Sequence, residues 1–165
     1  MVEVGDRAPD FTVPIAGGDA YDDVGEFTLA DALDDGPVVL AFVPAAFTGW
    51  CSAELAAFAD RYEAFERADA RVYGVSVDLP FALNVWADEL GLPFALLADP
   101  THAVIEAYGV VREGLYDAVT VAERSVFVID TDGVVTYRWV EDATEEPDWD
   151  ALVEEVAAAA AAAAD

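Results

Sequence analysis

Apolar residues of this chain gather in short unbroken runs between turn residues, a pattern typical of strands buried on both faces of a sheet. The run PVVLAFV at residues 37–43 is rich in β-branched side chains and predicts one such strand. Similar runs predict strands at residues 71–77, 94–97, 125–129 and 134–139. The last two are separated by a turn-forming segment and therefore predict a hairpin.

Helices are predicted where apolar residues recur at steps of three and four. The clearest stripe lies between residues 51 and about 67 and consists of Leu55, Phe58, Ala59, Tyr62 and Phe65. Cys51 lies four residues before Leu55, so it belongs to the same inward stripe and to the first helical turn. Further helices are predicted at residues 80–90, from Asp99 to Gly109, and from about Pro147 onward.

The alternation of these elements predicts an α/β fold, with a central mixed sheet flanked by helices on both faces. No repeat, linker or shift in composition divides residues 1–165, so we expect a single domain. Eight consecutive alanines, Ala157 to Ala164, have high helix propensity but little to anchor them. We expect residues 157–165 to form a helical tail that frays.

The charge of the chain is strongly one-sided. It has 34 acidic residues against seven basic ones, all of them arginines, and a formal net charge of -27. Such a balance excludes electrostatic binding to nucleic acid or to an anionic membrane surface. The composition resembles that of proteins from halophiles that accumulate salt, the alternative being an acidic protein of a mesophile.

Targeting signals are not evident in the sequence. No segment approaches about 18 unbroken apolar residues, and residues 1–10 have neither a cationic start nor an apolar stretch. Cys51 is the single cysteine, which rules out an intrachain disulfide and suits a reducing compartment. We therefore expect a cytoplasmic protein that is not exported.

The position of Cys51 favours reactivity. A cysteine in a first helical turn faces backbone N–H groups without intrahelical partners, which stabilise a thiolate. For any cysteine, lowering the pKa from about 8.5 to about 6 takes roughly 3.4 kcal/mol. A helix terminus supplies about 0.3 to 1 kcal/mol, at best about 2. A second positive group is thus required, unless Cys51 is only a small buried apolar residue.

Arg124 is the candidate for this positive group. It directly precedes the strand predicted at residues 125–129, and a guanidinium that keeps its charge at the edge of an apolar strand needs a partner. A thiolate is one such partner. The only histidine, His102, stands at a predicted helix start and is expected to be solvated; with one histidine and one cysteine the chain offers a poor metal site.

The segment around Cys51 resembles a known family. Pro44, Thr48 and Cys51 form P-x-x-x-T-x-x-C, which is similar to the peroxidatic signature of the peroxiredoxins, or AhpC/TSA family, and Arg124 in RSVFVID resembles the family's active-site arginine. The opening VGDRAPDF at residues 4–11 and the later ADP and AYGV segments extend the resemblance to residues 2–139. The T-G-x-C-x-x-E-L motif at residues 48–55 is most similar to that of the E-type alkyl hydroperoxide reductases and bacterioferritin-comigratory proteins.

The resemblance implies a thioredoxin-like fold and a thiol peroxidase that acts in antioxidant defence on hydrogen peroxide and organic hydroperoxides, without a cofactor or metal. It implies Cys51 as the nucleophile that becomes a sulfenic acid, with Thr48 and Arg124 binding the peroxide and Pro44 shielding the sulfur. Taken alone, Pro44 could equally end the strand and Thr48 could cap the helix. Glu54 is expected to hold Arg124 in place, the alternative being favourable charge in the first helical turn.

Aromatic residues near Cys51 are expected in the core or in the pocket wall: Phe42, Phe47, Trp50 and Phe81. Trp50, next to the nucleophile, is the candidate for the pocket entrance.

A single cysteine implies a one-cysteine mechanism in which an external reductant, a small thiol or a thioredoxin- or glutaredoxin-like protein, resolves the sulfenic acid. The family resemblance also implies a homodimer or larger homo-oligomer. A peroxide sensor that passes oxidation to a partner is the alternative function. A disulfide reductase is disfavoured because Thr48 stands where the C-x-x-C motif has its first cysteine.

Overall fold

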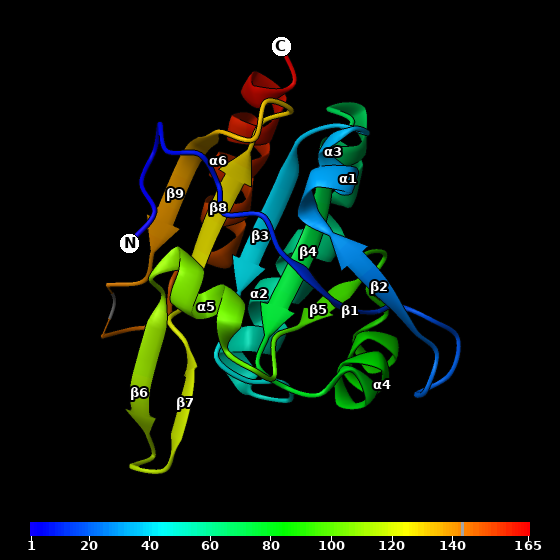
Figure 1. Ribbon diagram of the computed structural model, residues 1–165, viewed down its shortest axis with the longest axis vertical. Helices are drawn as coiled ribbons and strands as arrows, with labels where there is room; N and C mark the ends of the chain where they lie inside the picture. Colours follow the sequence, from blue (N-terminus) through cyan, green and yellow to red (C-terminus); the bar gives the residue numbers. More distant parts are fainter. Residues whose placement is uncertain (143) are drawn as a thin grey trace.

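The computed structural model describes residues 1–142 and 144–165. Its centre is a seven-stranded sheet with the order β2-β1-β5-β4-β3-β8-β9 (Figure 1). These strands are β1 (Thr12–Ala16), β2 (Val24–Thr28), β3 (Val38–Phe42), β4 (Arg71–Ser76), β5 (Leu96–Ala98), β8 (Ser125–Ile129) and β9 (Val135–Val140). The three central strands β3, β4 and β5 are parallel, and the outer pairs are antiparallel. The predicted mixed sheet is confirmed.

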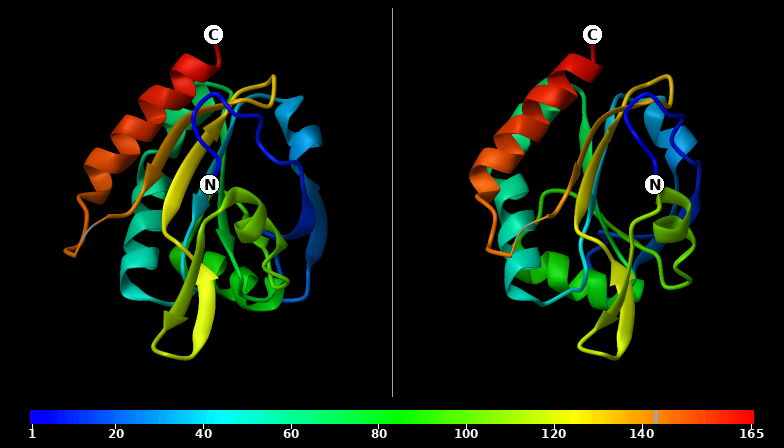
Figure 2. Two further views of the ribbon diagram at one scale, coloured as in Figure 1. Left: turned by 60° about the vertical axis from the view of Figure 1, so that its left-hand side comes forward. Right: turned by 90° about the vertical axis from the view of Figure 1, so that its left-hand side faces the viewer.

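Helices cover both faces of this sheet, as predicted. Figure 2 shows α2 (Gly49–Asp60) and α6 (Trp149–Ala163) on one side and α1 (Leu29–Leu33) and α5 (Ala103–Tyr108) on the other. Leu55 of α2, Leu83 of α4 (Pro80–Leu90) and Val153 of α6 share one hydrophobic core. Leu29 and Ile105 belong to the core on the opposite face.

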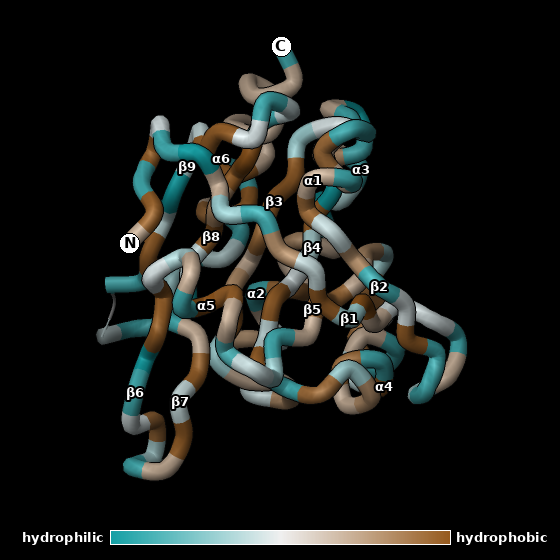
Figure 3. Tube along the Cα trace, viewed as in Figure 1, coloured by the Kyte–Doolittle hydropathy of each residue, from teal (hydrophilic) through white to brown (hydrophobic). Residues whose placement is uncertain are grey.

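The apolar runs lie where the pattern places them. Every residue of β3 and of β8 is buried, and the hydrophobic colour in Figure 3 accordingly runs along these central strands. The hairpin predicted from the last two runs is formed by β8 and β9. Burial on both faces explains why these strands show no polar alternation.

Some element bounds differ from the prediction. The single helix expected up to residue 67 is divided into α2 and α3 (Tyr62–Arg67), because the backbone at Arg61 departs from helical geometry with φ -112° and ψ 17°. The α5 helix begins at Ala103 rather than Asp99. The Asp99 carboxylate accepts the N–H groups of Val104 and Ile105 and so caps this helix from outside.

Five elements were not predicted. They are the strands β1 and β2, the short helix α1, and the hairpin of β6 (Val111–Leu115) and β7 (Val119–Ala122). Among the residues that the structure describes, the two strands of this hairpin pair only with each other, and their exposed residues show no continuous apolar run. Figure 1 shows it extending away from the main sheet.

A glycine in β4 makes room for a side chain of the neighbouring strand. A Cβ at Gly74 of β4 would lie only 2.6 Å from Cδ2 of Leu96 in β5, whereas its distance of 3.4 Å from Cδ2 of Leu55 in α2 is close to an ordinary contact. The missing side chain therefore lets Leu96 pack against β4 on the face that α2 covers.

The α6 helix includes most of the alanine run. It begins after Asp148, whose carboxylate accepts the N–H of Ala151, and its residue Ala160 has no exposed surface. Fraying of residues 157–165 stays a prediction. Among the described residues, no helix is long and apolar enough to span a membrane.

Candidate active site

The sheet topology brings the candidate residues to one edge. Pro44, Thr48 and Cys51 follow the carboxyl end of β3, and Arg124 precedes β8. Because β8 runs antiparallel to β3 with Ser125 opposite Phe42, the start of β8 lies beside the end of β3. The carboxyl ends of parallel strands are the usual place for ligands in α/β sheets.

Cys51 lies in the first turn of α2, as predicted, and is 1% exposed. It lines a pocket of about 290 Å³. The pocket is lined by Pro44, Ala45, Thr48, Gly49, Trp50, Cys51, Arg112, Leu115, Tyr116 and Arg124. The sulfur is thus open only to a molecule small enough to enter this space.

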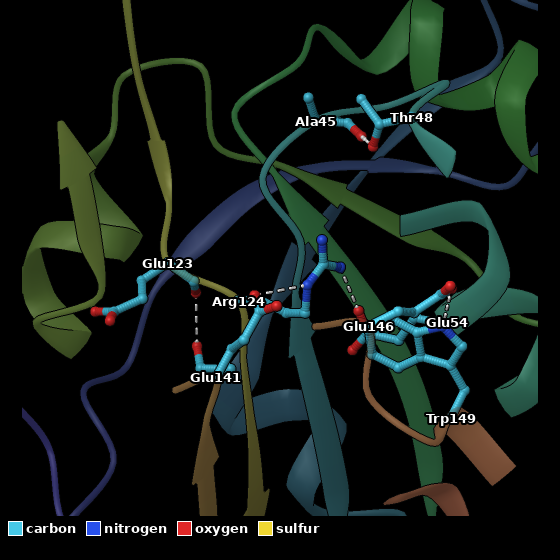
Figure 4. Close-up of polar contacts among 9 residues, drawn as sticks. Ala45, Thr48, Glu54, Glu123, Arg124, Glu141, Glu146 and Trp149 are labelled. Carbon is cyan, nitrogen blue, oxygen red and sulfur yellow. Dashed lines mark hydrogen bonds and ion pairs between the residues drawn. The ribbon is translucent and has the colours of Figure 1, made fainter. Parts of the chain in front are cut away.

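Thr48 is the N-cap residue of α2, but its side chain makes no capping hydrogen bond. Its hydroxyl instead donates to the carbonyl of Ala45 at 2.8 Å (Figure 4). A hydroxyl that donates one hydrogen bond still has lone pairs to accept another. The Thr48 hydroxyl can therefore accept a hydrogen bond from an O–H group of a ligand in the pocket.

Arg124 lies between two carboxylates (Figure 4). Its Nη1 donates to Oε2 of Glu54 at 2.7 Å, and its Nε donates to Oε2 of Glu141 at 3.0 Å. Its Cζ lies 5.3 Å from the ring centroid of Trp149, a cation–π distance. The guanidinium is 5% exposed, so its orientation is fixed from three sides.

The pKa values of both members of this ion pair are shifted. Burial raises the pKa of Glu54 to about 7, although the charge of Arg124 and its hydrogen bond lower it. Burial lowers the pKa of Arg124, but the charges and hydrogen bonds of Glu54 and Cys51 raise it, and the net direction is upward. Oε1 of Glu54 is buried with no hydrogen-bond partner among the described residues. Arg124 thus stays a cation beside the sulfur.

Most of the predicted site residues therefore meet at one place. Pro44, Thr48, Trp50, Cys51 and Arg124 line the same pocket. Glu54 lies behind Arg124, as expected. Trp50 is 37% exposed and also lines a neighbouring pocket of about 430 Å³, which fits the predicted position at the entrance.

Two of the other aromatic residues differ from the prediction, whereas Phe42 lies in the core as expected. Phe47 and Phe81 are 53% and 48% exposed, so they are neither core nor pocket wall. Phe42 is buried in the core on the opposite face of the sheet from Cys51. His102 is half-buried at the start of α5 and does not line the pocket.

Several residues of the site were missed by sequence reasoning. Arg112, Leu115 and Tyr116 reach the pocket from the β6–β7 hairpin, which had no recognisable apolar pattern. Glu141 and Trp149 contact Arg124. Glu141 could have been found once the β8–β9 hairpin was predicted, because the residue after β9 pairs with the residue before β8: the Glu141 N–H donates to the Arg124 carbonyl at 2.9 Å.

Comparison with known proteins agrees with this geometry. The family model described as the AhpC/TSA family matches residues 4–138. Alkyl hydroperoxide reductase E of Mycobacterium tuberculosis is 35% identical over 139 residues, covering 83% of this chain and 84% of that protein. A chloroplastic 2-cysteine peroxiredoxin of Chattonella marina is 34% identical over 146 residues, covering 84% of this chain and 71% of that protein.

A solved structure is similar over nearly its whole length. The crystal structure of peroxidoxin BcpB from Mycobacterium tuberculosis superposes with a TM-score of 0.84 at 31% identity, covering 98% of each chain. The fold is therefore the thioredoxin-like fold of peroxiredoxins. The chain belongs to the AhpC/TSA family and is a thiol-dependent peroxidase. Its single cysteine is consistent with a one-cysteine mechanism.

Proposed function

We propose that Cys51 is the peroxidatic nucleophile and that the pocket beside it takes hydrogen peroxide and organic hydroperoxides. The observation that carries this proposal is the arrangement of a buried cysteine in the first turn of α2 beside a buried, oriented arginine. The N–H groups at the start of α2 and the guanidinium of Arg124 both stabilise an anion, so they favour a thiolate at Cys51 and the charge that grows on a reacting peroxide.

The reaction has a balanced first step. The Cys51 thiolate attacks one peroxide oxygen, an S–O bond forms as the O–O bond breaks, and the leaving hydroxide or alkoxide takes up a proton to depart as water or alcohol. Arg124 donates hydrogen bonds to the peroxide oxygens, and the Thr48 hydroxyl accepts the peroxide hydrogen. The ring of Pro44, which is buried and has no N–H, shields the sulfur from bulk water.

Glu54 and Trp50 support these groups without touching the reacting atoms in the first step. Glu54 holds the guanidinium of Arg124 from behind at 2.7 Å. Trp50 lies at the rim of the pocket and limits what enters.

An external thiol completes the cycle, since no second cysteine exists in the sequence. The thiol attacks the sulfenic sulfur, an S–S bond forms and water leaves; a second thiol then releases Cys51 as a thiol together with the disulfide of the reductant. A small thiol or a thioredoxin- or glutaredoxin-like protein can fill this role. The lone cysteine also supports a reducing, cytoplasmic location and a role in antioxidant defence.

A homodimer or larger homo-oligomer is supported by exposed apolar side chains on one part of the surface. Phe81 and Val85 lie one turn apart on α4, and the Phe47 ring lies 6.1 Å from the ring of Trp86 on the same helix. Phe47, Phe81 and Val85 are each about half exposed. Sedimentation at high salt measures the oligomer, and Val85→Glu is expected to shift it to smaller species.

We also propose that residues 1–165 form one domain, that the acidic surface is an adaptation to high salt, and that residues 157–165 fray. Amide hydrogen exchange tests the last of these, because frayed residues exchange at nearly the rate of an unfolded peptide whereas a packed turn is protected.

The decisive experiment follows the only cysteine. One equivalent of hydrogen peroxide is expected to add a single oxygen to Cys51 within seconds, and peroxide is expected to turn over when a thiol is supplied. Cys51→Ser is the matched control, since Met1 is then the only sulfur left to oxidise. A folded wild-type protein whose Cys51 resists millimolar peroxide contradicts the proposal, and one that oxidises once but never turns over favours a sensor.

A further inference from the structure

The loop that leads from β3 to α2 is tied to the neighbouring strand by Asp78. The N–H of Ala46 donates to Oδ2 of Asp78 at 2.8 Å. The hydroxyl of Ser76 donates to the same oxygen, and Ser76 is itself buried. Figure 1 shows β3 and β4 side by side, and the two strands are parallel. Asp78, just past the end of β4, therefore reaches the loop just past the end of β3.

This tie lies next to a strained residue. Phe47 has φ +63°, a left-handed conformation that is unfavourable for a bulky side chain. Such conformations persist only where the surroundings hold them. The Phe47 side chain is 53% exposed, so its contact with the ring of Trp86 covers only part of it. Two polar contacts flank it instead: Ala46 to Asp78 on one side, and Thr48 to Ala45 on the other (Figure 4).

The loop also covers the sulfur. Pro44, Ala45 and Thr48 line the pocket together with Cys51, which is 1% exposed. A small peroxide fits the closed pocket. An external thiol must bring its own sulfur into line with the sulfur of Cys51, and a side chain this buried is not accessible to a second, larger molecule. The loop must therefore open between the oxidation and the resolution of Cys51.

We propose that Asp78 is a positioning residue that latches the Pro44–Thr48 loop in its closed form, which favours oxidation of Cys51 by peroxide and opposes attack on the sulfenic acid by an external thiol. This rests on Cys51 being the peroxidatic residue. The latch acts through the backbone of Ala46 and touches neither substrate. Releasing it changes the two half-reactions in opposite directions, whereas general damage to the site slows both.

The test measures the half-reactions separately in Asp78→Ala, which removes the acceptor for Ala46, and in Asp78→Asn, which keeps one oxygen acceptor but no charge. Stopped-flow tryptophan fluorescence gives the rate constant for oxidation by hydrogen peroxide. Thionitrobenzoate, a coloured small thiol, gives the rate constant for reaction with the sulfenic acid formed by one equivalent of peroxide. Asp130→Ala is the matched control, because Asp130 is also half-buried and accepts loop N–H groups, from Asp132 and Val134, far from the site.

For Asp78→Ala we expect oxidation to slow by about tenfold, equivalent to about 1.4 kcal/mol, and thiol attack to accelerate at least threefold. Both rate constants of Asp78→Asn are expected to lie between those of Asp78→Ala and those of the wild type. Asp130→Ala is expected to leave both rate constants unchanged. If Asp78→Ala does not fold, Asp78→Asn carries the test with the same pair of signs. Rate constants that fall together, or that both stay within twofold of wild type, overturn the latch. A wild-type protein that is not oxidised at Cys51 refutes the proposed function instead.

Discussion

The guanidinium of Arg124 donates to the carboxylate of Glu54 at 2.7 Å, although the two residues are 70 positions apart in the sequence. Glu54 comes from the first turns of α2, and Arg124 comes from the residue before β8. Because Cys51 lies three residues before Glu54 on the same helix, one ion pair ties the cation to the helix that carries the nucleophile. The orientation of Arg124 is thus set before any peroxide binds.

Replacing Arg124 by lysine is expected to lower kcat/KM for hydrogen peroxide by about 100-fold, or about 2.7 kcal/mol. A lysine keeps the charge, but its single ammonium cannot donate to Glu54 and Glu141 and also present a planar fork to a peroxide. Steady-state kinetics with a saturating thiol measures the loss. Arg138→Lys is the control, since Arg138 pairs with Glu3 away from the pocket. Equal activity of the two variants contradicts an orienting role for the fork.

Thr48 is expected to act through its hydroxyl. Thr48→Val keeps the shape but removes the group that can accept the peroxide hydrogen, and should slow oxidation of Cys51 by about 100-fold, while Thr48→Ser should retain most of the rate. Thr136→Val is a matched control, because the Thr136 hydroxyl also donates to a backbone carbonyl, that of Val128, outside the pocket. A Thr48→Val variant that is oxidised as fast as the wild type contradicts a role of the hydroxyl in binding peroxide and leaves it only the hydrogen bond to the Ala45 carbonyl.

How far the site could be predicted depended on which residues carry a local pattern. Cys51 was placed correctly because a buried strand and a helical stripe bracket it, and Arg124 because it stands at the edge of an apolar run. Trp149 contacts Arg124 only because α6 packs against the same face of the sheet as α2, which is a property of the tertiary fold. No single-sequence pattern contains that information.

The strands at the edge of the sheet were missed for a different reason. In β2 the burial pattern is irregular, and Gly25 lowers its strand propensity; in β1, Pro14 does the same. These strands are held by pairing with each other and with β5 rather than by burial on both faces. The exposure of Phe47 and Phe81 was equally hidden, because an aromatic residue type does not reveal whether its surface is covered within the chain or by another molecule.

Glu54 is expected to make stability depend on pH. Burial raises its pKa from 4.5 to about 7 in the folded protein, so between these values the folded state binds a proton that the unfolded state has lost. This contribution to stability is fully present below about pH 4.5 and is lost as pH rises through about 7. The free energy of unfolding of wild type relative to Glu54→Gln should therefore fall by roughly 3 kcal/mol across that window.

Denaturant unfolding of both proteins at fixed high salt, from acid to mildly alkaline pH, measures this difference. The many other carboxylates titrate in both proteins and cancel in the comparison. Glu63→Gln is the control, since Glu63 is an exposed partner of Arg67 on α3. If the free energy of unfolding of wild type relative to Glu54→Gln instead rises with pH in the same window, the attraction of Arg124 outweighs the cost of burying Glu54.

Salt is expected to act on the fold before it acts on the chemistry. With a net charge of -27, the surface repels itself over the Debye length, which is about 30 Å at 0.01 M salt and about 3 Å at 1 M. Arg124, by contrast, is 5% exposed and contacts its carboxylates at 2.7 and 3.0 Å, distances at which mobile ions do not intervene. The melting temperature should therefore rise steeply with potassium chloride, while the rate constant for oxidation of Cys51, corrected for the folded fraction, should change much less.

Circular dichroism and stopped-flow fluorescence on the same samples separate the two quantities. A melting temperature that is independent of salt contradicts the self-repulsion of the acidic surface, and a rate constant that falls in parallel with the melting temperature shows that the site shares that repulsion.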